Sequence, residues 1–471
     1  MKIIHWFRRD LRITDNRALA EAARRGDEII PVYVLSDWKK SHRWSGPARQ
    51  QFLCDCLAAL DANLRTLGSR LIIRCGDAER ELEKLIAGCA ADALTFNRDP
   101  DLFGIASERR IERMAARHGC TVHACKDVAL HERDEVLKPD GSPYRVFTPY
   151  FKAWQKLDKQ SPAGRLRRLA TPRDIESLDL PTLDHWQLPA APPGILEGGE
   201  KAARNRLQRF LDGGIGRYGA QRNTPYGQTT SRLSQDLRFG LLSIREVYAK
   251  CRKAMAGASA DARKSIHQFI SELCWREFYF QILWHFPEVL EREFNPQFRA
   301  LEWDYDEQAF AAWREGRTGF PIVDAAMREL AQTGYMHNRT RMIVSMFLTK
   351  DLHIDWRLGE QFFMQSLVDG EIGSNNGGWQ WSAGTGADAA PYFRIQNPWT
   401  QCARHDPEGR YVKRFVPELA AVDPRRFREP PADGRPLAAG YPLPIVDHAR
   451  ERERTLEMFS RCKEDIAPRD I

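Results

Sequence analysis

The chain lacks the cysteine patterns that mark disulfide frameworks and zinc sites. Its ten cysteines are scattered over 471 residues, and no Cys-x-x-Cys pair occurs. Cys54 and Cys56 are too close together for a zinc knuckle, and no second ligand pair lies near them in the sequence. We therefore expect reduced thiols, no metal centre and a cytoplasmic location, where thiols stay reduced.

Long apolar segments are also missing. No run of 18 apolar residues occurs, so the sequence predicts no membrane-spanning helix. The first ten residues have no apolar core of the secretory kind, and we expect no targeting signal there. Hydrophobic residues make up 42% and charged residues 29%, which excludes a mainly disordered chain, a collagen and a coiled-coil rod. The formal net charge of +7 permits a polyanionic partner without requiring one.

The first third of the chain alternates short apolar runs with amphipathic stretches. This alternation predicts a parallel, doubly wound α/β sheet. The predicted strands are 3–7, 29–35, 71–74, 93–96 and 121–124, and the predicted helices are 16–25, 47–67, 77–89 and 101–118. The loop at 8–12 has no glycine, which excludes an ordinary nicotinamide turn but allows another ligand at the carboxyl edge of the sheet.

The rest of the chain divides by composition. Residues 161–200 are rich in proline and predict a long, irregular interdomain connection. The pattern is helical from Lys201 to about Phe427, and 446–464 predicts a last helix. We expect three parts: an α/β domain at 1–130, a connector at 131–200 and an all-α domain at 201–471.

Two segments of the helical part suggest ligand binding. The segment 230–234, Thr-Ser-Arg-Leu-Ser, precedes a helical stretch, where hydroxyls cap free N–H groups and the same groups can bind a phosphate. By itself it favours a simple cap. The segment 369–381 holds two Asn and two Trp among four glycines. Glycine supplies conformations that a core helix does not need, so this segment predicts a loop around a planar ligand. A turn with packed Trp side chains is the alternative.

One predicted helix carries an unusual mixture of side chains. Glu272, Trp275, Arg276 and Tyr279 share a face at i, i+3, i+4 and i+7. That face fits a core helix with an internal ion pair. It also fits a pocket wall that stacks a base and hydrogen-bonds its edge.

These segments resemble the DNA photolyase/cryptochrome family, and most closely its class I cyclobutane pyrimidine dimer photolyases. The resemblance covers essentially the whole chain. It is densest at 275–278, 319–327, 334–339, 377–381 and 388–394. It implies an N-terminal α/β domain that holds a light-harvesting antenna, a long connector, and an all-α domain that binds FAD.

The resemblance implies FAD that is active in its reduced anionic form. Arg341 and Asp369 would pair beside the flavin ring, and the neutral amide of Asn375 would face flavin N5. Phe269 stands where the family often has Trp. The implied cofactor contacts are Tyr218, Thr230, Ser231, Arg232, Leu233, Ser234, Phe269, Arg341, Asp369, Gly370, Glu371 and Asn375.

The implied substrate is DNA with a flipped-out pyrimidine dimer. Excited reduced FAD would give it an electron and split it into two pyrimidines, with Glu272 and Asn375 as catalytic residues. Trp379, Trp356 and Trp303 would form an electron-transfer chain to the resting flavin. The implied DNA and substrate contacts are Arg222, Glu272, Trp275, Arg276, Tyr279, Asn338, Arg339, Met342, Trp381 and Gln401.

Three alternatives remain open. A blue-light-sensing cryptochrome is one, although plant-type sensors usually carry Asp at the position of Asn375. A (6-4) photolyase is another, although that group has two His where Asn338 and Met342 stand. A DNA-binding module with a structural flavin is a third, and it leaves the Trp chain unexplained.

The resemblance also bears on a second chromophore and on partners. Phe103-Gly104 occupies the place of the Asn-Glu pair of folate-binding relatives, which favours a deazaflavin antenna, or none, over folate. We expect a cytoplasmic monomer that meets nucleoid DNA without a membrane or an obligate protein partner.

Overall fold

The computed structural model describes residues 1–227 and 230–464. The chain forms two compact units. Unit 1 comprises the described residues of Met1–Ala191, Leu196–Gly219 and Thr230–His285, and unit 2 those of Pro192–Ile195, Ala220–Thr229 and Phe286–Ile471. The three-part domain division expected from the sequence stays a prediction.

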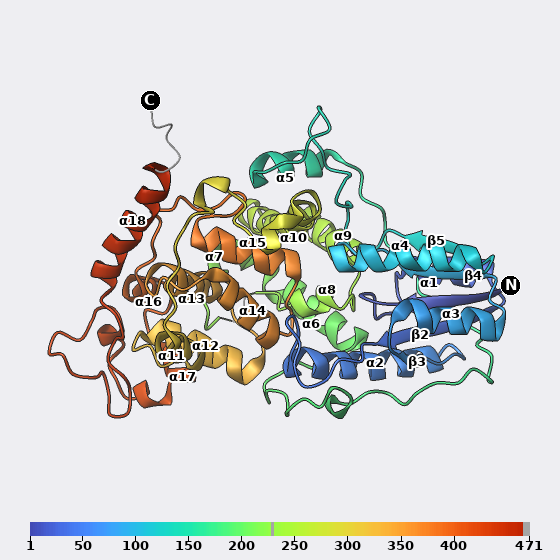
Figure 1. Cartoon of the computed structure of the whole chain (residues 1–471), viewed down its shortest axis with the longest axis horizontal. Coiled ribbons are helices and arrows are strands. Elements are labelled where there is room, and N and C mark those ends of the chain that lie inside the picture. Colours follow the sequence, from blue (N-terminus) through green and yellow to red (C-terminus); the bar gives the residue numbers. More distant parts are fainter. Residues whose placement is uncertain (228–229, 465–471) are drawn as a thin grey trace. The chain divides into compact units, whose positions relative to one another are not determined.

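Unit 1 contains a five-stranded parallel sheet with the order β3-β2-β1-β4-β5 (Figure 1). The strands are β1 (Lys2–Phe7), β2 (Glu28–Leu35), β3 (Ile72–Cys75), β4 (Ala93–Asn97) and β5 (Thr121–Cys125). β1, β2 and β4 are almost entirely buried and apolar, as parallel strands covered on both faces require. The strand order reverses between the neighbouring strands β1 and β4, so the predicted doubly wound sheet is confirmed.

Helices link the strands and cover the sheet. They are α1 (Arg17–Arg25), α2 (Pro47–Arg65), α3 (Ala78–Cys89) and α4 (Leu102–Arg117). Asn16, Asp77 and Asp101 cap α1, α3 and α4 by accepting hydrogen bonds from backbone N–H groups, which fixes where these helices begin. α3 and α4 cover one face, where Leu82 and Ile111 join a core with strand side chains.

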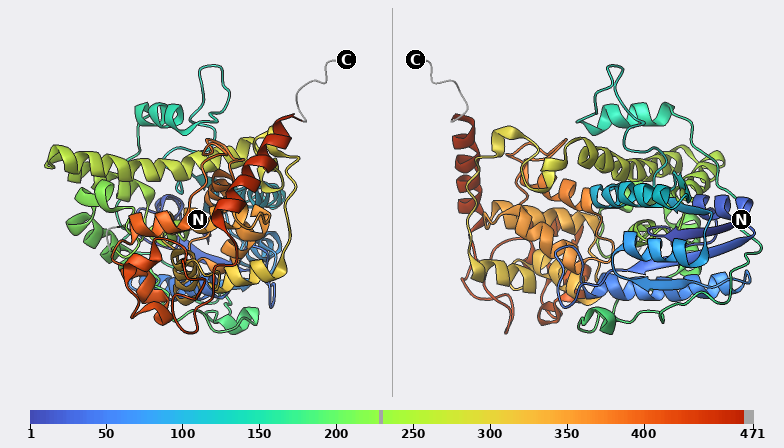
Figure 2. Two further views of the ribbon diagram at one scale, coloured as in Figure 1. Left: turned by 90° about the vertical axis from the view of Figure 1, so that its left-hand side faces the viewer. Right: turned by 45° about the vertical axis from the view of Figure 1, so that its right-hand side comes forward.

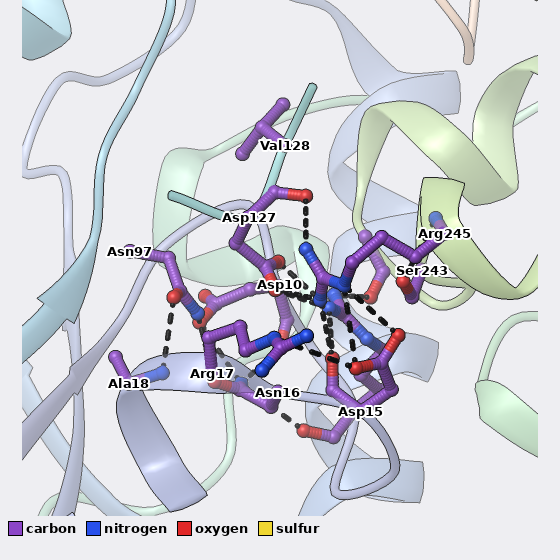
Figure 3. A network of polar contacts seen from close by, with 12 residues as sticks. Asp10, Asp15, Asn16, Arg17, Ala18, Asn97, Asp127, Val128, Ser243 and Arg245 are labelled. Atoms are coloured by element: carbon purple, nitrogen blue, oxygen red, sulfur yellow. Dashed lines mark hydrogen bonds and ion pairs between the residues drawn. The ribbon is translucent and has the colours of Figure 1, made fainter. Parts of the chain in front are cut away.

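A buried polar cluster joins the loops after β1 and β5 to α9 (Ile244–Ala256) (Figure 3). Arg12 donates to both oxygens of Asp127 at 2.7 Å, and Arg245 donates to Asp127 at 2.6 Å and to Asp15 at 3.2 Å. Burial alone would raise the pKa of Asp127, but the charges of Arg12 and Arg245 hold it below its ordinary value. We call these four residues the Arg12–Arg245 cluster.

The carboxyl edge of the sheet is occupied by further ion pairs. Arg9 donates to Asp99 at 2.9 Å, and Arg8 pairs with Glu108. These side chains are at most 10% exposed.

The segment after the sheet is mostly irregular, as expected. One helix, α5 (Phe147–Lys156), was not predicted within 131–200. Residues 157–199 run along the sheet, where the backbone N–H of Ile29 donates to Ala170 O and that of Leu178 donates to Ile73 O. The other helices of unit 1 are α6 (Glu200–Gly213), α8 (Ser234–Arg238) and α10 (Ala260–His285), and α7 (Tyr218–Gln221) spans the boundary between the units.

Unit 2 is helical. Its helices are α11 (Glu307–Glu315), α12 (Pro321–Thr333), α13 (Asn338–Lys350), α14 (Trp356–Ser366), α15 (Ile372–Ala383), α16 (Pro398–His405), α17 (Arg410–Phe415) and α18 (His448–Glu464). One core contains Trp313, Trp356, Trp379 and Trp399. α18 packs against α13, and Figure 2 shows it from two sides. In the part of the chain that the structure describes, none of the helices has the length and apolar content for crossing a membrane.

Candidate functional site

The hydroxyl-rich segment of unit 1 turns the chain into α8. Ser231 Oγ accepts a hydrogen bond from the Leu233 N–H at 3.4 Å, and Arg232 has a φ of +52°. The expected hydroxyl cap is wrong, because the N-cap residue is Leu233 and it makes no side-chain cap bond. A positive φ is uncommon for a residue with a side chain and marks a backbone held in place by its surroundings.

The ring of Tyr218 contacts that of Phe269, which lies in the first half of α10. Their ring centroids lie 5.3 Å apart at 81°, and Phe210 of α6 packs 4.7 Å from Phe269. The Gly219 N–H donates to Ser265 Oγ at 3.1 Å, which attaches the start of α7 to α10. Two of the predicted cofactor residues are therefore brought together by packing.

The mixed face of α10 separates into two groups. Trp275 stacks on Phe147 of α5 with centroids 3.7 Å apart and planes 7° apart, and Tyr279 lies 5.6 Å from Trp275. Glu272 accepts a hydrogen bond from Gln268 Nε2 at 2.8 Å. Phe147 was missed because α5 was not predicted, so the sequence offered no partner for Trp275.

Arg276 lies apart from that group. Its guanidinium donates to Val128 O at 2.8 Å and stacks 4.7 Å from the Phe280 ring. These contacts bind α10 to the segment after β5, and they do not resemble a substrate contact. Next to it, buried Glu277 accepts from Trp154 Nε1 at 2.6 Å and from the Leu130 N–H at 2.5 Å, which fixes the same helix.

In unit 2, the expected ion pair between Arg341 and Asp369 is present. Arg341 Nη2 donates to both Asp369 oxygens at 3.1 and 2.8 Å, and its Nε donates to Met336 O. Burial alone would lower the pKa of Arg341, but the carboxylate of Asp369 raises it above its ordinary value. Gly370 and Glu371 follow directly, and Glu371 is the N-cap residue of α15.

The glycine-rich segment is a helix, so the predicted loop at 369–381 is wrong. Residues 372–383 form α15, which packs on α13 and α14. A Cβ at Gly359 of α14 would lie 2.1 Å from Cη2 of Trp379, so the two helices approach at a point where only glycine fits. Gly359 therefore permits the close packing of α14 against α15.

Asn375 on α15 has one half of its amide bound to the protein. Its Nδ2 donates to Glu360 O at 3.1 Å, which leaves Oδ1 to accept a hydrogen bond. A protonated ring nitrogen such as N5 of a reduced flavin is a donor of the required kind. This amide and the Arg341–Asp369 pair fit the cofactor that the motifs imply.

A groove of about 560 Å³ lies beside α13 and α16 in unit 2. We call it the arginine groove; its lining residues are Asn223, Arg339, Arg394, Ile395, Gln396, Asn397, Thr400, Gln401, Arg404 and His405. Among the described residues of this lining, none carries a carboxylate. Arg339 donates to Asn223 Oδ1 at 2.9 Å, and burial together with the charges of Arg222 and Arg404 lowers its pKa. Converging guanidinium groups without a counter-charge form a binding site for anions such as phosphates.

The groove brings several predicted residues together. Arg339 and Gln401 line it, and Arg222 is close enough for its charge to lower the pKa of Arg339. Asn338 Nδ2 lies 4.0 Å from Met342 Sδ, so these two residues share a face of α13 as expected. Trp381 is half-buried on α15. The sequence did not indicate Arg404 or Arg394, because nothing in their local pattern distinguishes them from surface arginines.

The three tryptophans of the predicted chain all lie in unit 2. Trp356 and Trp379 belong to one buried core, and Trp303 packs against it. The Trp379 ring lies 5.0 Å from Phe363 and 6.1 Å from Trp313. Trp356 Nε1 donates to Glu293 at 3.1 Å. Glu293 was not found from the sequence because it lies 63 positions from Trp356.

Comparison with known proteins covers the whole chain. Residues 3–168 match the family described as DNA photolyase, and residues 269–461 match the FAD binding domain of DNA photolyase. The deoxyribodipyrimidine photo-lyase of Agrobacterium fabrum is 41% identical over 98% of this chain and 98% of its own. That of Escherichia coli is 35% identical over 97% and 98%.

Solved structures agree with these matches. A class III photolyase from Agrobacterium tumefaciens has a TM-score of 0.91 and 39% identity, covering 98% of both chains. An archaeal photolyase from Sulfolobus tokodaii, described with two FAD molecules, has a TM-score of 0.85 and 31% identity, covering 98% of this chain and 100% of its own. A Synechocystis cryptochrome has a TM-score of 0.88 and 27% identity, covering 97% and 99%. The chain therefore belongs to the DNA photolyase/cryptochrome family.

Proposed function

We propose that this chain is a deoxyribodipyrimidine photo-lyase, an enzyme that uses light to split cyclobutane pyrimidine dimers in DNA. Bound FAD, reduced and excited by light, supplies the electron that opens the cyclobutane ring and takes it back afterwards. The observation that carries the proposal is the amide of Asn375, which has Nδ2 bound to Glu360 O and Oδ1 left as an acceptor.

The protein's own residues hold and orient the cofactor. By motif, Tyr218 and 230–234 would hold the diphosphate side. Arg341 and Asp369 would flank the ring system as a fixed ion pair. A neutral amide at Asn375 adds no charge beside a reduced anionic flavin, whereas an aspartate would add a negative charge there.

The substrate side follows from charge and stacking. The arginine groove would bind DNA phosphates, because the described residues of its lining include three arginines and no carboxylate. Trp275 would present an aromatic surface to the substrate, and the Phe147 ring stacks on Trp275. Photolyases flip the damaged bases out of the duplex. Glu272 would then hydrogen-bond a pyrimidine edge.

Position 104 bears on the second chromophore. A Cβ at Gly104 would lie 2.4 Å from Asp99 Cβ and 2.8 Å from Arg8 Nη2, so no larger side chain fits there without a shift. The glutamate of folate-binding relatives is excluded from this place. We propose that the antenna, if any, is a deazaflavin or another chromophore held elsewhere. We further propose that the enzyme works as a monomer in the cytoplasm.

The alternatives are weaker on the same residues. The Synechocystis cryptochrome shares the fold, but this chain has Asn375 where plant-type sensors carry Asp. Asn338 and Met342 stand where (6-4) photolyases have histidines. The closer similarity to class I photolyases, which the motifs indicate, stays a prediction.

Repair of a defined substrate tests the proposal. Purified protein, reduced with dithionite, is mixed with irradiated oligothymidine under blue light. We expect restored thymine absorbance, and flavin fluorescence in the supernatant after heat release. A folded, flavin-containing protein that restores no thymine would contradict the enzymatic function.

DNA binding should weaken steeply as salt rises. The arginine groove should contact phosphates, and each such contact adds about 0.9 to the slope of log K against log salt. Arg339→Gln should lower that slope by about 0.9. Arg328→Gln is the matched control, because Arg328 pairs with Glu418 away from the groove. An unchanged slope in Arg339→Gln would remove this residue from the phosphate contacts.

Trp275→Ala should reduce selectivity for damaged DNA. The change removes a stacking wall worth about 1–3 kcal/mol per base in single-strand binders. We therefore expect the ratio of damaged to undamaged affinity to fall about tenfold or more, since 1.4 kcal/mol is a factor of ten. Competitive binding in the dark measures this ratio. If both affinities fall equally, Trp275 is a packing partner of Phe147 and not a substrate contact.

A further inference from the structure

The indole of Trp356 lies among charged groups in unit 2. Its Nε1 donates to Glu293 Oε1 at 3.1 Å, and Glu293 is 3% exposed. Arg357 donates to both Glu293 oxygens at 3.0 and 3.1 Å and also pairs with Asp355 at 3.1 Å. Its guanidinium carbon lies 4.7 Å from the Trp356 ring centroid. The carboxylate that accepts the indole N–H is thus shared with Arg357, and Arg299 Nε donates to the backbone oxygen of the same Glu293 at 3.1 Å.

The indole of Trp379 has an uncharged setting. Its ring contacts are Phe363 and Trp313, and its edge lies against the backbone of Gly359. Among residues 1–227 and 230–464, no group accepts a hydrogen bond from Trp379 Nε1. The Trp379 side chain is 2% exposed.

One turn of α14 carries Trp356 and contacts the indole of Trp379. Trp356 is the first residue of α14, and Gly359 follows three positions later on the same face. Trp379 packs on Gly359 so closely that a Cβ there would lie 2.1 Å from Cη2. The Trp379 indole of α15 therefore packs on the same short stretch of α14 that begins with Trp356.

We infer that Glu293 is a positioning residue that makes Trp356 easier to oxidise than Trp379 and so gives electron transfer between them its direction. The carboxylate stabilises positive charge that develops on the indole whose N–H it accepts. The guanidinium of Arg357 over the ring opposes this effect, but two carboxylates share its charge. Trp379 has neither stabilising group.

The inference rests on the proposed function, which supplies the oxidant. With oxidised FAD bound and excited by light as the oxidant, Trp379 would lose one electron to it, and Trp356 would then give one electron to the oxidised Trp379. Trp379 returns to its neutral closed-shell state, and Trp356 becomes a radical cation. No covalent bond breaks, and the proton stays on Trp356 Nε1, bound to Glu293.

Two variants of the same ion pair separate charge from structure. Glu293→Gln keeps the size and an acceptor oxygen but removes the negative charge. In flash photolysis of the holoprotein, we expect the ratio of oxidised Trp356 to oxidised Trp379 to fall about tenfold, the factor that 1.4 kcal/mol produces. Arg357→Met removes the opposing positive charge and should leave this ratio unchanged or raise it. A purely structural role predicts equal losses in both variants and would overturn the inference.

A dark measurement and two controls complete the test. In ¹⁵N spectra, Glu293→Gln should move one indole N–H signal, that of Trp356, and leave the others in place. Glu418→Gln breaks a comparable Glu–Arg pair with Arg328 and should change neither readout. If Trp379→Phe blocks flavin photoreduction while Glu293→Gln behaves as wild type, this inference alone fails. If Trp379→Phe photoreduces normally, the proposed electron path itself is wrong.

Discussion

Replacing Trp379 by Phe should abolish photoreduction of the oxidised flavin and leave repair by chemically reduced enzyme intact. Phenylalanine keeps an aromatic ring in the core but is much harder to oxidise than tryptophan. Repair by reduced enzyme needs no electron from the protein, so dimer splitting should continue at the wild-type rate. The two rates are measured by flavin absorbance under blue light and by thymine recovery after dithionite reduction.

The matched control for this variant is Trp399→Phe. Trp399 lies in the same buried core and packs 5.0 Å from Phe320, but it is outside the predicted chain. We expect normal photoreduction in this control. Loss of photoreduction in both variants would show that disturbance of the core, and not the loss of an electron donor, caused the effect.

Arg245→Met should destabilise the protein by about 3–5 kcal/mol, because removing one partner of a buried ion pair leaves an uncompensated charge. Arg245 is 1% exposed and donates to both Asp15 and Asp127. Urea unfolding followed by circular dichroism gives the free energy of unfolding. Arg204→Met is the control, since Arg204 of α6 is 35% exposed where it pairs with Glu246 of α9, and surface pairs are worth about 0–1 kcal/mol.

Arg245→Met should also raise the pH at which the protein begins to unfold in acid. The folded pKa of Asp127 lies below its ordinary value, so its contribution to stability is complete above the unfolded pKa and is lost as pH falls toward the folded one. Without Arg245, one of the two charges that lower this pKa is absent. Unfolding should then begin at a higher pH than in wild type. An unchanged midpoint would mean that Arg12 alone determines the protonation of Asp127.

The sheet could be predicted from the sequence because burial on both faces leaves a clear signal. Strands such as 29–35 and 93–96 are short continuous apolar runs bounded by capped helices, and the observed strands differ by at most one residue at either end. The parallel order follows from helices between the strands. The class of fold therefore depends on local patterns that one sequence contains.

The site was harder to predict because its contacts are distant in sequence. Trp275 meets Phe147 across 128 positions, and no local pattern records that pairing. The glycines of 369–381 were taken for a loop, although residues 372–383 form the helix α15, which packs on α13 and α14. Leu233 occupies the N-cap position that hydroxyls were expected to fill. Tertiary packing overrides local preference at each of these places.

The Arg12–Arg245 cluster also has a consequence for synthesis on the ribosome. Arg12, Asp15 and Asp127 are made long before Arg245, which follows Asp127 by 118 positions. Translation at about 5–20 residues per second would separate the two groups by several seconds or more. Until α9 has emerged from the ribosome, the cluster has two carboxylates, Asp15 and Asp127, and only one arginine, Arg12. The N-terminal sheet therefore completes its polar core only after more than half of the chain has been translated, and a fragment that stops before α9 should fold poorly.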